Sequence, residues 1–157
     1  MTGQEVELLG PALGRFGAVA ALALAAAGSA LGTGAAGAAG IGAWKRCYEQ
    51  NKAAPFLLVA FIGAPLSQTI YGLILQGAIV KAAEVPEAFP ALIGAGILGG
   101  LAMGMSAWMQ GKAGAGACDA LAETGQGFGN YLIAIGVVET VALFVMVFIQ
   151  GSLSAAV

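Results

Sequence analysis

The segment VVETVALFVMVF, residues 137–148, contains one charged side chain, Glu139, within an apolar run that extends over about 128–155. A membrane-crossing helix needs about 20 mainly apolar residues, and this run is long enough. Backbone groups in lipid must be hydrogen-bonded within the segment, so the run predicts a helix. A carboxylate in the middle of such a helix is costly, which indicates either a function or a set of polar partners.

The composition of the whole chain also indicates a membrane protein. The 157 residues are 59% hydrophobic and only 9% charged, and the mean hydropathy is +0.90. Soluble domains carry about 25% charged residues, so this chain lacks the side chains that a water-facing surface needs. The net charge of −2 and the scattered basic residues give no nucleic-acid-binding patch. The absence of histidine removes the commonest general base and metal ligand.

Four segments are long and apolar enough to be transmembrane helices, which predicts an all-α membrane protein. Their expected ranges are about 12–44, 54–82, 88–117 and 128–155. The polar connections between them divide the chain into two helical hairpins, 1–82 and 83–157.

The basic residues predict the orientation, because cytoplasmic connections carry an excess of lysine and arginine. Four of them lie in or near the first and third connections: Lys45, Arg46, Lys52 and Lys112. The other two, Arg15 and Lys81, lie toward the opposite side. We therefore expect a multi-pass protein of the plasma membrane with connections one and three in the cytoplasm. Both termini and connection two are expected outside.

The two hairpins resemble each other. GSALGTGAAGA at 28–38 aligns with MSAWMQGKAGA at 105–115, and QTIYGLI from Gln68 aligns with ETVALFV from Glu139. An even number of spans separates the copies, so both run in the same direction. The pattern predicts a tandem duplication, unlike the inverted repeats of many secondary transporters. Gln68 thus occupies in hairpin one the place of Glu139 in hairpin two.

The first expected helix is rich in glycine. GTGAAG at 32–37 fits a dinucleotide-binding pattern, but that pattern needs a preceding strand and here lies inside an apolar helix. Small residues in membrane helices allow close backbone approach. We expect a helix-packing role for Gly28, Gly32, Gly34 and Gly37. The first helix is then suited to an inner ring packed against copies of itself, with the bulkier helices two and four facing lipid.

Hairpin geometry predicts which polar groups share a depth. Gln110 and Glu139 lie about equally far from the third connection, so an antiparallel hairpin brings them to one level. Thr33 and Gln68 are likewise symmetric about the first connection, and Gln68 is the midpoint of its span. We expect a polar layer at the depth of Glu139.

The second expected helix carries a polar face at this depth. Ala64, Ser67, Gln68 and Tyr71 follow i, i+3, i+4, i+7 spacing and share one side of the helix. With Glu139 and Gln110 they form a set rich in oxygen, the ligand that hard cations prefer. The alternative is that the glutamines only hydrogen-bond a structural glutamate and hold helices together. A mid-membrane glutamate with several polar neighbours favours ion handling.

Four motifs together resemble a known family: the glycine-rich first helix, PLSQTIYG, MQGKAGAG and VVETVAL. The chain is similar, over nearly its whole length, to the membrane rotor proteolipid of V-type ATPases, known as the K subunit in the bacterial enzymes. The resemblance implies identical subunits in a ring that turns in lipid against a stator membrane protein and is joined to a central stalk. It implies no cofactor and no catalysis by the chain alone.

The resemblance also implies an ion site for Na⁺, or for H⁺ in proton-carrying relatives. Its sodium ligands, carried over to this sequence, are Glu139, Gln68, Gln110, Ser67 and the backbone carbonyl of Ala64, with Tyr71 hydrogen-bonding the glutamate. The hydroxyl ligand is Ser67 where threonine is expected. Sodium is favoured because the cluster holds more oxygen than a proton needs. The alternatives are a proton-carrying rotor, a small four-helix cation/proton secondary transporter, and a purely structural four-span protein.

Overall fold

The computed structural model describes residues 2–154, beginning with the long helix α1, Gly3–Glu49. A capping box starts this helix: the backbone N–H of Glu5 donates to the Thr2 hydroxyl (3.3 Å), and that of Thr2 donates to the Glu5 carboxylate (2.7 Å). It ends before Asn51, whose φ of 52° interrupts the helical conformation. The helix is therefore longer at both ends than the expected 12–44, because its polar flanks are also helical.

The second crossing consists of three consecutive helical elements. They are α2, Leu58–Gly63, a 3₁₀ turn η1, Ala64–Leu66, and α3, Ser67–Ala82. Pro65 lies in the 3₁₀ turn, where its missing N–H and its ring are incompatible with continuous α-helical hydrogen bonding. The expected helix at 54–82 is thus correct in extent to within a few residues, but it is interrupted next to the polar face.

The second hairpin begins with a 3₁₀ turn η2, Pro86–Ala88, and contains α4, Phe89–Thr124, and α5, Phe128–Ser154. Gly125, with φ 67°, ends α4 in the left-handed conformation, and its N–H donates to the Leu121 carbonyl (2.8 Å). The expected third helix, 88–117, is therefore too short by about two turns. Residue 155, the expected end of the fourth, lies outside the described residues.

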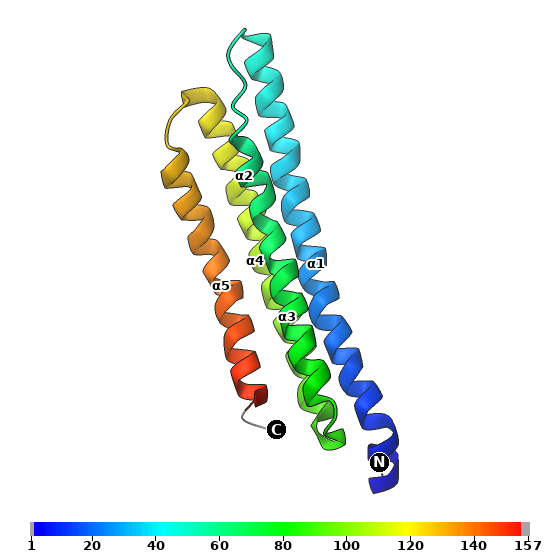
Figure 1. The fold of residues 1–157 in the computed structure, drawn as a ribbon. Coiled ribbons are helices and arrows are strands. Elements are labelled where there is room, and N and C mark those ends of the chain that lie inside the picture. The colour runs from blue at the N-terminus through cyan, green and yellow to red at the C-terminus, as the bar shows by residue number, and fades with distance from the viewer. Residues whose placement is uncertain (1, 155–157) are drawn as a thin grey trace.

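The described chain is all-α, as predicted. Residues 2–154 contain no strand, and four helical segments are long and apolar enough to cross a membrane. In Figure 1 the α1–α2 and α4–α5 connections lie at one end of the bundle. The start of α1, the end of α5 and the α3–α4 connection lie at the other end. The division into duplicated domains 1–82 and 83–157 remains a prediction.

Helices α1 and α4 run parallel (Figure 1) and pack closely along their length. A methyl group on Gly28 would overlap the backbone of Gly104, and one on Gly32 would overlap the carbonyl of Ala107. Only glycine allows such backbone contact between two membrane helices. Helix α3 lies against α1, and α5 lies against α4 and α3.

The four glycines expected to pack have different environments. Gly28 and Gly32 lie against α4 within the chain. A Cβ on Gly37 would have only Ile62 in van der Waals contact (3.8 Å), and one on Gly34 would have no atom within 4 Å. The face of α1 that carries Gly34 is therefore open in a single copy.

Candidate ion-binding site

Glu139 lies midway along α5 and is held by donors from two other helices. The Tyr71 hydroxyl on α3 donates to one carboxylate oxygen (2.7 Å), and the Gln110 amide on α4 donates to the other (3.1 Å). Hydrogen bonds to a charged acceptor are stronger than neutral ones. Each oxygen of the half-buried carboxylate therefore has a fixed partner.

Gln110 connects this carboxylate to the second crossing. Its side chain is fully buried, and its NH₂ group also donates to the carbonyl of Ile135 (3.2 Å), one turn before Glu139. Its side-chain oxygen accepts a hydrogen bond from the amide of Gln68 (2.8 Å), which is also fully buried. A buried amide without partners is costly, so this pair fixes the amide orientations on α3 and α4.

Ser67 and Ala64 lie beside Gln68 on the same side of the second crossing. The Ser67 hydroxyl is 3.1 Å from the Ala64 carbonyl oxygen and 3.2 Å from the Gln68 side-chain oxygen. The 3₁₀ turn at Ala64–Leu66 brings this carbonyl close to the next helix. Hydroxyl, carbonyl and amide oxygens thus adjoin one another where Pro65 interrupts the helix.

The structure brings all six predicted site residues into one connected cluster. It extends from the Ala64 carbonyl through Ser67, Gln68 and Gln110 to Glu139 and Tyr71. Thr33, expected at the depth of Gln68, does not join this cluster. Its hydroxyl donates within α1 to the carbonyls of Ser29 (2.8 Å) and Ala30 (3.2 Å).

The sequence reasoning missed one further contact that positions the carboxylate. The Ser106 hydroxyl on α4 donates to the carbonyl of Val138 (2.9 Å), directly before Glu139. Ser106 lies one helical turn before Gln110, so both side chains face α5. That spacing, together with the polarity of Ser106 in an apolar span, could have predicted this contact with α5.

The chemistry of the cluster suits a small hard cation. Its potential ligands are one carboxylate, two amide oxygens, one hydroxyl and one carbonyl, an all-oxygen set. Residues 2–154 contain no group of three or more histidine, cysteine, aspartate or glutamate side chains placed to hold a metal ion. The single negative charge matches a monovalent cation or a proton.

Replacing Tyr71 with phenylalanine is expected to make Glu139 more reactive toward a carbodiimide, which attacks protonated carboxyl groups. The change frees one carboxylate oxygen from its donor, an interaction of about 1.5–3 kcal/mol that attack by the carbodiimide must otherwise break. We expect labelling to accelerate roughly tenfold or more. Tyr131→Phe, elsewhere in the bundle, is the control. Equal rates for both variants and wild type would show that the hydroxyl does not stabilise the carboxylate.

Comparison with known families matches residues 93–149 to the ATP synthase C-subunit family. The match covers about a third of the chain, including most of α4 and α5 and both Gln110 and Glu139. Together with the four apolar helices it supports a multi-pass membrane protein. The first hairpin lies outside the match. Comparison with curated proteins finds no match to the chain.

Proposed function

We propose that this chain, whose second hairpin matches the ATP synthase C-subunit family, is the ion-carrying rotor protein of a V-type rotary ATPase. The observation that carries the proposal is the placement of Glu139. It is the one acidic residue midway along an apolar helix, and it is held from both sides by Tyr71 and Gln110. Such a carboxylate can bind an ion on one side of the membrane and release it on the other as the rotor turns.

Sodium is the proposed ion because of the oxygen atoms around the carboxylate. A proton needs only the carboxyl group and one hydrogen-bond partner, and Tyr71 already supplies a partner. A sodium ion must replace its lost hydration with several oxygens, which Gln68, Gln110, Ser67 and the Ala64 carbonyl can supply. The alternative is a proton-carrying rotor, and the labelling test below distinguishes it from a sodium-carrying rotor.

Sodium binding requires the two amides to turn. The NH₂ group of Gln110 now faces Glu139, and its oxygen accepts from Gln68. A cation beside Glu139 repels that NH₂ group and attracts the amide oxygen. Rotation of the Gln110 amide presents the oxygen to the ion, and the released Gln68 amide can then turn its own oxygen inward. The same network can thus serve both the unloaded and the loaded carboxylate.

Assembly into a ring of identical subunits is supported by the open face of α1. A stripe of exposed small residues follows this helix and consists of Ala23, Ala27, Ala30, Gly34 and Ala38. Small side chains allow a second helix to approach closely. The proposed ring lies in the plasma membrane, turns against a stator protein and is joined at its cytoplasmic end to the central stalk. The chain itself catalyses nothing.

The test is carbodiimide labelling of Glu139 with and without sodium at one pH. Sodium should slow the labelling because it occupies the site, and protection should weaken as pH falls because protons compete for the same carboxylate. Gln110→Ala should require roughly tenfold more sodium for equal protection, since one ligand of a charged ion is lost. Gln76→Ala, on α3 outside the cluster, should behave as wild type.

Labelling that is indifferent to millimolar sodium would identify a proton rotor, with the glutamines acting only between helices. The particle mass in detergent distinguishes either kind of rotor from a small secondary transporter. A closed ring of many copies supports the rotor. A dimer would favour the small cation/proton secondary transporter.

A further inference from the structure

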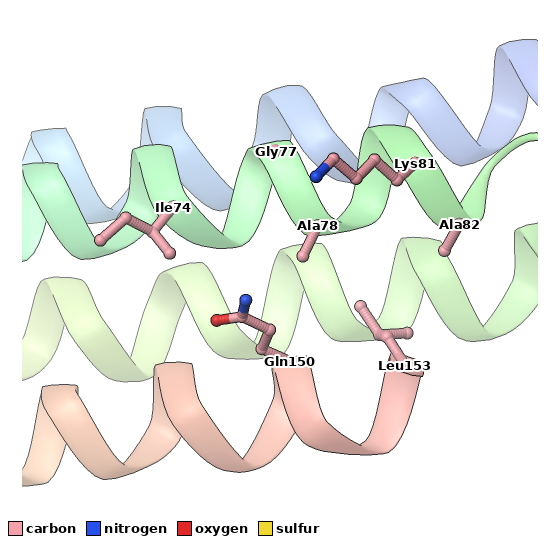
Figure 2. A pocket seen from close by; sticks show the side chains of 7 residues that line it. All are labelled: Ile74, Gly77, Ala78, Lys81, Ala82, Gln150 and Leu153. Carbon is pink, nitrogen blue, oxygen red and sulfur yellow. The ribbon is translucent and has the colours of Figure 1, made fainter. Parts of the chain in front are cut away.

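A groove of about 550 Å³ lies between the C-terminal parts of α3 and α5, away from the Glu139 cluster (Figure 2). The residues that line it are Ile74, Gly77, Ala78, Lys81, Ala82, Gln150 and Leu153. Glycine and alanine on α3 leave space there, since a Cβ on Gly77 would have no atom within 4 Å. The groove opens on the outer side of the bundle, where α3 and α5 expose large apolar side chains.

The only formal charge in the lining is the ammonium of Lys81. Figure 2 shows this side chain extending back along α3 toward Gly77, with the amide of Gln150 across the groove on α5. None of the ion pairs within residues 2–154 involves Lys81. The groove therefore combines one unpaired cation and an amide with apolar side chains.

The polar and apolar parts of the groove lie at different membrane depths. Lys81 is thirteen residues beyond Gln68 on the same helix, which at 1.5 Å per residue is about 20 Å along the axis. The hydrocarbon of one leaflet is about 15 Å deep. With the Gln68 layer near mid-membrane, Lys81 lies at headgroup level. Ile74 is only six residues beyond Gln68 and lies within the hydrocarbon.

Two other occupants fit less well. An entry path for cations that travel to Glu139 is disfavoured because Lys81 would repel them. A second copy of the chain could approach Lys81 at this level only with Glu84 and Glu87, which lie exposed at the α3–α4 connection and bring no apolar part into the groove. The occupant must carry a negative group at headgroup level and an apolar part below it.

We propose that this groove binds a phospholipid of the adjoining leaflet. Its phosphate accepts hydrogen bonds from the Lys81 ammonium and the Gln150 amide, and an acyl chain follows Ile74 toward the middle of the membrane. Attraction between a basic side chain and a lipid phosphate is strongest at headgroup level, where water is partly excluded. The proposal depends on the chain crossing a membrane and does not depend on its being a rotor.

The experiment is native mass spectrometry of the purified protein, in the assembly in which it is isolated, titrated with phosphatidylglycerol in detergent. Wild type should retain one more phospholipid per chain than Gly77→Leu, whose side chain fills the groove. Lys81→Met should need roughly fivefold more lipid for the same occupancy, the effect of one basic side chain at the membrane surface. Lys81→Arg should bind as wild type.

Lys112 supplies the matched control, because its ammonium lies over the Trp108 ring (4.4 Å) on another face of the bundle. Lys112→Met should retain phospholipid as wild type does. Excess inorganic phosphate should not displace the lipid, because the acyl chain adds to its binding. Equal retention by wild type, Lys81→Met and Gly77→Leu would overturn the proposal. So would equal losses in Lys81→Met and Lys112→Met, or displacement of the lipid by inorganic phosphate.

Discussion

Glu139→Gln is expected to abolish ion-coupled ATP hydrolysis in the assembled enzyme while leaving the bundle and its oligomer intact. Glutamine has nearly the volume of glutamate, its amide oxygen can still accept the hydrogen bond from Gln110, and its NH₂ group can donate to the Tyr71 hydroxyl oxygen. It cannot carry the negative charge that a cation or a proton must neutralise. Transport should therefore fall to background, and carbodiimide labelling of the protein should disappear.

The measurement needs a control carboxylate that is not part of the cluster. Glu123 is exposed near the end of α4, where it lies 3.9 Å from Arg46. Glu123→Gln should keep both transport and the labelling of Glu139. Normal transport by Glu139→Gln would exclude this carboxylate as the ion carrier, whatever the fate of the labelling.

Two glycines of α1 should respond differently to leucine, because one faces the chain itself and the other does not. Gly28→Leu should destabilise the fold by about 3 kcal/mol or more, since even a Cβ would overlap the backbone of Gly104 and the helices must separate. Gly34→Leu should leave the single chain folded, because no atom lies within 4 Å of its added Cβ. It should instead prevent ring formation.

Thermal unfolding in detergent measures the first effect, and particle mass measures the second. Leu→Ile changes at exposed positions, such as Leu73 on α3 and Leu143 on α5, are suitable mild controls. Intact rings from Gly34→Leu would mean that the open face of α1 does not contact a neighbouring copy. A fully stable Gly28→Leu would contradict the close packing of α1 against α4.

The sequence predicted the apolar parts of the helices correctly but placed several of the helix ends wrongly. The expected ends followed the change from apolar to polar residues, which marks the edge of the hydrocarbon and not the end of a helix. At the start of α1, the capping box of Thr2 and Glu5 extends the helix into a polar region. At its other end, Arg46 pairs with Asp119 on α4, so both helices continue past the expected boundary.

The candidate site was predictable where it depended on depth within one hairpin. Equal distance from the third connection predicted that Gln110 and Glu139 meet, and they are hydrogen-bonded. Contacts between hairpins depend on how the helices pack side by side, which the same symmetry does not specify. Gln68 therefore bonds Gln110 across the hairpins, while Thr33 bonds its own helix. The interruption at Pro65 follows from the proline ring and its missing N–H, both of which are evident from the sequence.

The ion pairs where α1 and α4 end, next to the first and third connections, have a mechanical consequence in the proposed rotor. Arg46 on α1 bonds Asp119 and lies near Glu123, one turn farther along α4, so one side chain braces two points of the neighbouring helix. Parallel helices joined in this way resist twisting about each other more than either does alone. A stalk bound to this end would then contact a rigid pair of helices. Torque generated at the depth of Glu139 would reach the stalk with little loss to elastic deformation of the helices.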